Sequence, residues 1–182
     1  ILPRDDALSK APRIKIDTDT VQGSINLTGG RIDDLLLKKY TTKPNGNENV
    51  QLLNPANAQH GYYGEFGWLS QDQSLSLPSK STRWQTVNTD LTTDNDVALQ
   101  WNNGRGLQFG KTIAIDDNYM FTVTQSVTNR SPNPVTLYPF ALIGRDGLPP
   151  EMTGAFILHE GPIGYMDGEL QEIDYGDLDD GE

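Results

Sequence analysis

The fold of this chain is decided by the stretch from Val97 to Arg145, which reads VALQWNNGRGLQFGKTIAIDDNYMFTVTQSVTNRSPNPVTLYPFALIGR. Apolar and polar residues alternate along it, as in strands that bury one face, and turn sequences interrupt the alternation. The turns fall at Asn103-Gly104, at Asp116-Asp117-Asn118 and at Ser131-Pro132-Asn133-Pro134. Four strands joined by short turns predict an antiparallel meander, which is the unit of β-sandwiches and barrels.

The second strand of this meander, residues 107–115, departs from strict alternation. Leu107 and Phe109 are followed by Thr112, Ile113 and Ile115, so the pattern slips near Gly110. An extra residue in one strand shifts the alternation in this way, and we therefore expect a β-bulge near Gly110.

The residues before the meander also have the pattern of strands. Residues 14–18 alternate, and residues 24–27 and 31–40 are joined by Thr28-Gly29-Gly30, whose glycines supply the positive φ of a tight hairpin. A short strand over residues 50–53 ends at Asn54-Pro55. No internal repeat is visible, so the sequence predicts an all-β fold with a large two-sheet sandwich.

An aromatic strand from Gly61 to Leu69 places Tyr62, Gly64, Phe66 and Trp68 on one face. This face is expected to enter the core. Tyr63, on the other face, is a candidate to line a groove.

The overall composition fits a single domain that folds without disulfides. The chain has 182 residues and no cysteine, which excludes disulfide scaffolds, Cys-ligated zinc, iron–sulfur clusters and thiol catalysis. No segment approaches the roughly 20 apolar residues of a membrane helix. The sequence begins at Ile1, and its first methionine is Met120, so we expect a processed or excised piece of a longer protein.

The negative charge is concentrated at one end of the chain. Of 25 acidic residues, nine lie between Glu160 and Glu182, where there is no Lys or Arg, and the other 16 are nearly balanced by 14 bases. A near-neutral body with an acidic end argues against binding to nucleic acid or to anionic lipid, because both require clustered bases. The segment Glu169 to Leu178 is expected to be coil with some helical potential, since its acids are too dense for a sheet face.

The candidate acid–base residues are two histidines, His60 and His159. Either could pair with a carboxylate such as Glu160 or Glu65. Nothing in their spacing brings the two histidines together, and a loop histidine with a strand-end histidine explains them equally well.

Other catalytic or ligand motifs fail on their spacing. No Gly-x-Ser-x-Gly occurs, Gly104-Arg105-Gly106 lacks the third glycine of a dinucleotide loop, and residues 177–182 lack the order of a calcium loop. Two glycosylation sequons occur, Asn26-Leu27-Thr28 and Asn129-Arg130-Ser131. The sequence therefore predicts no catalytic, cofactor-binding or metal-binding residue, and it singles out no partner-binding residue.

Three stretches together resemble the large periplasmic domain of the YidC/Oxa/Alb family of bacterial membrane protein insertases. The first is Gln22-Gly23-Ser24-Ile25 with residues 29–35, the second is residues 116–125, and the third is residues 159–164 followed by 167–170. The similarity runs from about Arg13 to Leu178, nearly the whole chain. Each motif alone is modest, but their order and spacing are specific.

The resemblance implies an antiparallel β-supersandwich of the galactose-mutarotase-like type, held between a first membrane helix and the membrane core of the insertase. It divides the chain into a linker over residues 1–12, a periplasmic sandwich over 13–166 and an acidic segment over 167–182. The family domain continues into further strands, so a truncated domain with an open sheet edge is expected.

The resemblance also implies a function without catalysis, on the periplasmic side of the bacterial inner membrane. The domain would contact accessory subunits of the Sec translocon or nascent membrane proteins, while the membrane core inserts and folds them, alone or with that translocon. The same fold hosts aldose epimerases. An alternative hypothesis is therefore a carbohydrate-binding or epimerase-like protein that uses the Tyr62–Trp68 aromatics as a sugar platform.

Overall fold

The computed structural model describes residues 1–148 and 159–179. The chain divides into two compact units, Ile1–Asp146 and Gly147–Glu182. This division differs from the expected boundary at residue 166, and each unit is described by itself below.

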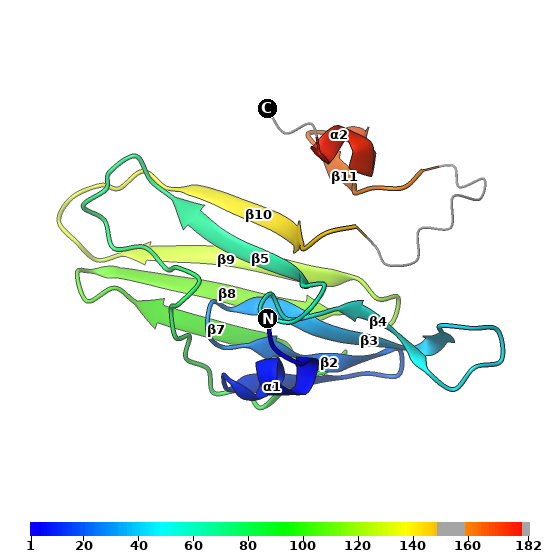
Figure 1. Ribbon diagram of the computed structural model, residues 1–182. Helices are drawn as coiled ribbons and strands as arrows, with labels where there is room; N and C mark the ends of the chain where they lie inside the picture. The colour runs from blue at the N-terminus through cyan, green and yellow to red at the C-terminus, as the bar shows by residue number, and fades with distance from the viewer. Residues whose placement is uncertain (149–158, 180–182) are drawn as a thin grey trace. The chain divides into compact units, whose positions relative to one another are not determined.

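The first unit contains a larger sheet of seven strands (Figure 1). Their order is β10-β5-β3-β2-β1-β6, and β4 also pairs with β3. Neighbouring strands are antiparallel except for β1 and β6, which pair in parallel over two residues. The strands are β1 (Arg13–Asp17), β2 (Val21–Asn26), β3 (Arg31–Thr41), β4 (Asn49–Leu53), β5 (Tyr62–Leu69), β6 (Asp90–Leu91) and β10 (Tyr138–Arg145).

The smaller sheet contains the first three strands of the predicted meander, β7 (Val97–Asn102), β8 (Leu107–Ile115) and β9 (Phe121–Asn129). The expectation of a fourth strand in this meander was wrong, because β10 pairs with β5 in the larger sheet. Both ladders of β8 run without a register shift, so the expected bulge near Gly110 was wrong. Every second residue of β8 from Leu107 to Ile115 is buried, and Lys111 is one of them. The sequence therefore shows a break in its apolar–polar alternation, because Lys111, a charged residue, occupies an inward position of β8.

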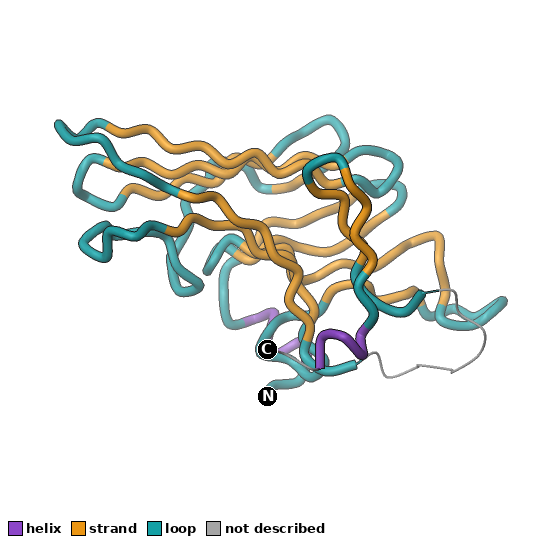
Figure 2. Tube along the Cα trace, turned by 90° about the horizontal axis from the view of Figure 1, so that it is seen from above, coloured by secondary structure: helices purple, strands orange, loops and turns teal. Residues whose placement is uncertain are grey.

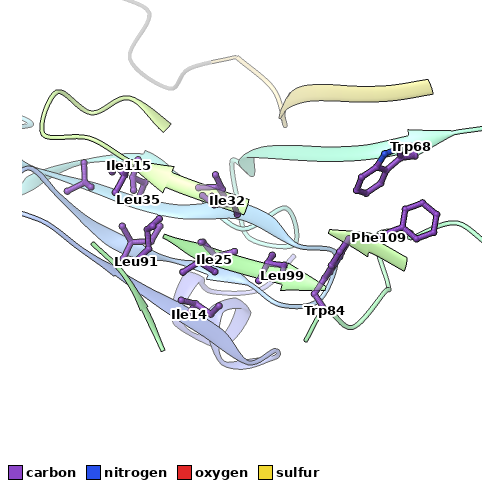
Figure 3. Packing of buried hydrophobic residues seen from close by; sticks show 14 of the residues in the cluster. Ile14, Ile25, Ile32, Leu35, Trp68, Trp84, Leu91, Leu99, Phe109 and Ile115 are labelled. Carbon is purple, nitrogen blue, oxygen red and sulfur yellow. The ribbon is translucent and has the colours of Figure 1, made fainter. Parts of the chain in front are cut away.

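The hydrophobic core lies between the two sheets, which confirms an all-β antiparallel sandwich. Trp68 of β5 meets Phe109 of β8 edge to face, with ring centroids 5.1 Å apart. Figure 3 shows these rings gathered with Trp84, which comes from the loop before β6. Aliphatic side chains from both sheets complete the cluster, including Ile14, Ile16, Val21, Ile25, Ile32, Leu35, Leu91, Val97, Leu99, Leu107, Ile113 and Ile115.

The predicted β2–β3 hairpin is confirmed at its turn, where Gly29 and Gly30 have φ of 84° and 64°. A bulge follows in β3. Ser24 pairs with Asp34 while Ile25 pairs with Ile32, so Asp33 is an extra residue without a partner in β2. Consecutive residues of a regular strand point to opposite faces, but a bulge can turn two of them the same way.

Residues 1–12, expected to be a linker, contain the helix α1 (Arg4–Ser9) packed on the larger sheet (Figure 1). Ala7 of this helix is buried. Arg4 forms an ion pair with Asp34, and the backbone N–H of Leu2 donates to the carbonyl of Asn57. The segment is therefore held at two points.

The second unit contains a hairpin of β11 (Ile163–Met166) and β12 (Glu169–Glu172), followed by the helix α2 (Tyr175–Asp179). The expectation of coil over residues 169–178 was wrong for residues 169–172, which form β12. The helical potential predicted for the same segment is confirmed by α2. The density of acids does not prevent a strand here, because all four side chains of β12 are exposed and remain solvated.

Within the described part of the chain, β9 pairs only with β8 and β10 only with β5, so each ends its sheet. Figure 2 shows the long strands of the sandwich from above, with the loops gathered mainly at their ends. No helix among the described residues has the length and apolar character needed to cross a membrane.

Candidate functional site

The two histidines lie in different units. His60 is exposed in the loop between β4 and β5, where its φ is 56°. His159 lies in the second unit, with its Nδ1 3.0 Å from Oδ1 of Asp174. The expected partners Glu160 and Glu65 were wrong for His159, because the hairpin brings a carboxylate 15 residues later in the chain beside it.

Glu65 is held by a different partner. The Nε of Arg31 donates to Oε2 of Glu65 at 2.6 Å, and both side chains are largely buried. The guanidinium of Arg31 also lies over the ring of Tyr63, 4.5 Å from its centroid. Glu65 therefore serves to hold Arg31 against the sheet.

The rings of the aromatic strand β5 make structural contacts. Trp68 is buried and Phe66 packs against the core, as predicted. The guanidinium of Arg145 lies 4.6 Å from the ring centroid of Tyr62, and Gly144 packs against the ring of Tyr63, where an added Cβ would be 2.8 Å from Cζ. Tyr63, the candidate to line a groove, is half-buried, with its ring in contact with Arg31 and Gly144.

The bulge in β3 creates a cluster of buried charges. Asp33 forms an ion pair with Arg13 of β1, and Asp34 forms one with Arg4 of α1. Ser24 links the two pairs, since its Oγ accepts from Nε of Arg13 at 2.7 Å and donates to Asp34. The cluster fixes α1 and β1 to β3, and its carboxylates are already neutralised by the two arginines.

Lys111 is a second buried charge, 2% exposed, and it connects the two sheets. Its Nζ donates to the carbonyls of Gly29 and Gly30, each at 3.3 Å, and lies 4.6 Å from the ring centroid of Trp84. Burial lowers the pKa of Lys111 to about 8, a shift that nearby Glu65 partly opposes. The contact with the β2–β3 turn indicates a structural role. The break in apolar–polar alternation along residues 107–115 is the sequence signal that could have identified Lys111 as an inward-facing residue.

An apolar groove of about 520 Å³ opens on the first unit, between β9 and the loop that leads to β10. Its lining includes Trp68, Val127, Val135 and Leu137, with the amides of Gln125 and Asn129 beside them. Gln125 also donates from Nε2 to the carbonyl of Gly67 at 2.7 Å, a hydrogen bond from β9 to β5. The chemistry of this groove suits an apolar chain with a few polar groups.

A more polar groove of about 540 Å³ lies on the larger sheet over β2, β3 and β4, and its lining includes Gln22, Lys38, Glu48 and Gln51. Lys38 is engaged there with Asp17, 2.6 Å from its Oδ1. Lys15 and Lys38 together hold the pKa of Asp17 down, at about 2.

The asparagine side chains of both glycosylation sequons form local hydrogen bonds in turns. The Oδ1 of Asn26 accepts from the N–H of Thr28, and the Oδ1 of Asn129 accepts from the N–H of Ser131. The segment 177–182, which lacks the order of a calcium loop, lies partly outside the described residues, at 180–182. Over residues 1–148 and 159–179, no group of three or more His, Asp or Glu side chains is placed to hold a metal ion.

Comparison with known proteins identifies the family. The family model of the YidC periplasmic domain matches residues 13–182. The chain is 47% identical over 181 residues to the membrane protein insertase YidC of Jannaschia sp. (strain CCS1), covering 98% of this chain and 29% of that protein.

Other relatives have the same name. The membrane protein insertase YidC of Methylobacterium sp. (strain 4-46) is 48% identical over 177 residues, which cover 96% of this chain and 28% of that protein. The membrane protein insertase YidC of Bradyrhizobium diazoefficiens is 45% identical over 184 residues, which cover 99% of this chain and 29% of that protein. The chain thus spans less than a third of the length of the relatives it matches. By its sequence and its β-sandwich, this chain belongs to the YidC periplasmic domain family.

Proposed function

We propose that this chain is a periplasmic, non-catalytic interaction domain of an inner-membrane protein insertase. In this role it helps to insert and fold membrane proteins, alone or with the Sec translocon, by contacting nascent membrane proteins or Sec accessory subunits. The observation that carries the proposal is the match of residues 13–182 to the periplasmic domain of proteins named membrane protein insertases.

The geometry of the sandwich supports binding as its mode of action. The apolar groove beside Trp68 offers a surface of the kind that takes apolar polypeptide. Two of the groups with acid–base potential are engaged in structural contacts, since His159 pairs with Asp174 and Glu65 pairs with Arg31. Nucleic acid is not an expected partner, because the chain has a net charge of −11.

Photo-crosslinking in the intact insertase tests the contact. A photoreactive amino acid replaces Val135, which lines the apolar groove, and in a control protein it replaces Asp94, which is exposed in the turn between β6 and β7. We expect crosslinks to membrane proteins under insertion, or to Sec subunits, from position 135 and not from position 94. No crosslinks from groove positions during active insertion would overturn the proposal.

A second test addresses the absence of catalysis. His60→Ala combined with His159→Asn removes both imidazoles, while the asparagine amide can still donate to Asp174. Insertion of a membrane protein, followed by protease protection, should proceed at the original rate. A large loss of insertion in this variant would revive an acid–base role.

A further inference from the structure

The hairpin of the second unit has a tight turn at one end and a hydrogen-bonded base at the other. Its strands are joined by Asp167 and Gly168, with φ of 53° and 86°, the pair of positive values typical of a type I′ two-residue hairpin turn. Beyond the strands, the N–H of Ile173 donates to Pro162 at 3.2 Å and that of Tyr175 donates to Glu160 at 2.9 Å. The hydrogen-bonded ladder therefore continues past β11 and β12.

The base of the hairpin is closed by two further contacts. Gly161 lies so close to the opposite strand that an added Cβ would be 1.8 Å from the carbonyl oxygen of Ile173. Next to it, Nδ1 of His159 lies 3.0 Å from Oδ1 of Asp174. We refer to residues 159–179, the closed hairpin with α2, as the acidic hairpin.

The surface of the acidic hairpin is unusually apolar. Tyr165 and Leu170 face each other across the two strands and are 74% and 60% exposed, and Ile163 and Met166 are 59% and 58% exposed. An isolated two-stranded hairpin is only marginally stable in water, and large apolar side chains gathered on one exposed element indicate an interaction surface.

Acidic side chains lie among these apolar ones on both faces. Glu172 is opposite Ile163 on the face of Tyr165 and Leu170, and Glu169 is opposite Met166 on the other face. The sequence from 160 to 179 contains seven acidic residues and no Lys or Arg. A second copy of the hairpin or an anionic lipid surface would be repelled, whereas a basic surface would be attracted.

We propose that the acidic hairpin is a docking element for a polypeptide partner that presents lysine or arginine side chains around an apolar strip. The inference rests on the proposed function, which it deepens by assigning a surface and the chemistry of the partner. The apolar strip would cover Tyr165 and Leu170, one cation would meet Glu172 on the same face, and another would reach Glu169 beside the turn on the other face.

A titration of the 182-residue chain with a defined probe tests this inference. The probe is a synthetic peptide in which lysine and leucine alternate, and the control peptide has glutamate in place of lysine. In amide NMR spectra, we expect the lysine peptide to shift signals of β11 and β12, and the glutamate peptide to leave them unchanged. Raising the salt from about 0.05 to about 0.5 M should weaken the binding, because the ion pairs are exposed.

Matched variants separate charge from apolar contact. Glu169→Gln with Glu172→Gln should weaken binding of the lysine peptide by about tenfold, whereas Glu48→Gln with Asp94→Asn changes the net charge equally and should have no effect. Leu170→Ser should weaken binding about tenfold through loss of apolar contact. Equal affinities of the two charge variants, or peptide-induced shifts confined to the sandwich, would overturn the inference.

Other occupants give different results, each of which contradicts the inference. Binding to phosphatidylcholine vesicles that needs Leu170 but not Glu169 or Glu172 would indicate a lipid surface. Sedimentation that depends on protein concentration and is lost with Tyr165→Ser would indicate a second copy.

The failure of this inference is distinguishable from that of the proposed function. In the intact insertase, crosslinks from Val135 but none from positions 165 and 170 would leave the interaction domain standing and remove the hairpin from it. Loss of crosslinks from all these positions would count against both.

Discussion

Lys111 shows how one residue can change both the sequence pattern and the energetics of a sandwich. It occupies an inward position of β8, and its ammonium reaches the Gly29–Gly30 turn of the opposite sheet. Burying a charge is costly unless it is paired, and here it contacts carbonyls and an aromatic face, with only partial compensation from nearby Glu65. Its pKa is therefore lowered to about 8 from the ordinary value of 10.5.

This lowered pKa predicts that the first unit becomes more stable in alkaline solution. Between pH 8 and 10.5 the unfolded chain binds a proton on Lys111 that the folded chain has lost, so the free energy of unfolding rises with pH. The rise over this window is about 3 kcal/mol, and below pH 8 Lys111 adds no dependence. Urea unfolding at several pH values should show the rise in the original protein and in Lys39→Met, an exposed control. Lys111→Met should lack it, and an equal rise in that variant would contradict the assignment.

The pair of Arg13 and Asp33 makes a second prediction at this scale. Both side chains are nearly buried, so Arg13→Met leaves an uncompensated carboxylate and should lower the free energy of unfolding by about 3–5 kcal/mol. Adding Asp33→Leu removes that charge and should recover much of the loss. Lys15→Met breaks an exposed pair with Asp17 and should change stability little. A double variant as unstable as Arg13→Met alone would show that the pair does more than neutralise charge.

At the scale of elements, the strands with alternating residues were predictable, and the failures have identifiable causes. β6 pairs over only two residues, Asp90 and Leu91, which is too short to leave a periodic pattern. The helix α1 is six residues long and depends on the contact of Arg4 with Asp34, a residue 30 positions away. Local sequence carries no signal for such a contact.

The candidate site was less predictable than the strands. The sequence named His159, Glu65 and Tyr63, but not Asp174 or Arg31, which pair with the two titratable groups. Each partner comes from a segment that only the folded chain brings near. The hairpin of the second unit was not predicted, because a sheet with one buried face cannot accommodate so many acidic residues. All four residues of β12 are exposed, so this restriction does not apply to it.

The β2–β3 turn provides a prediction with a matched control. Gly30 has φ of 64°, and an added Cβ would lie 2.9 Å from Nε1 of Trp84 and 3.1 Å from Nζ of Lys111. Gly104 has φ of 73°, with nothing within 4 Å of its added Cβ. Gly104→Ala should therefore cost only the backbone strain of about 1–2 kcal/mol, and Gly30→Ala should cost clearly more in urea unfolding. Equal losses would show that the space around Trp84 adapts without cost.

At the scale of the whole molecule, charge is divided unevenly between the two units. The sandwich buries an apolar cluster between two sheets, and its buried carboxylates pair with arginines. The second unit has no Lys or Arg after residue 147, and its hairpin exposes apolar side chains. The uncompensated negative charge of the chain is therefore concentrated in the second unit.

The division into two compact units predicts two cooperative units in solution. Phe109 is fully buried in the sandwich between Trp68 and Trp101, so Phe109→Ala should lower the stability of the first unit by about 3–5 kcal/mol. Amide hydrogen exchange should then accelerate throughout β8 and leave β11 and β12 unchanged. In the converse variant, Gly161→Ala should accelerate exchange in the hairpin alone, because its Cβ meets Ile173. Parallel acceleration in both units by either variant would mean that they unfold together, and the acidic hairpin would then share the stability of the sandwich.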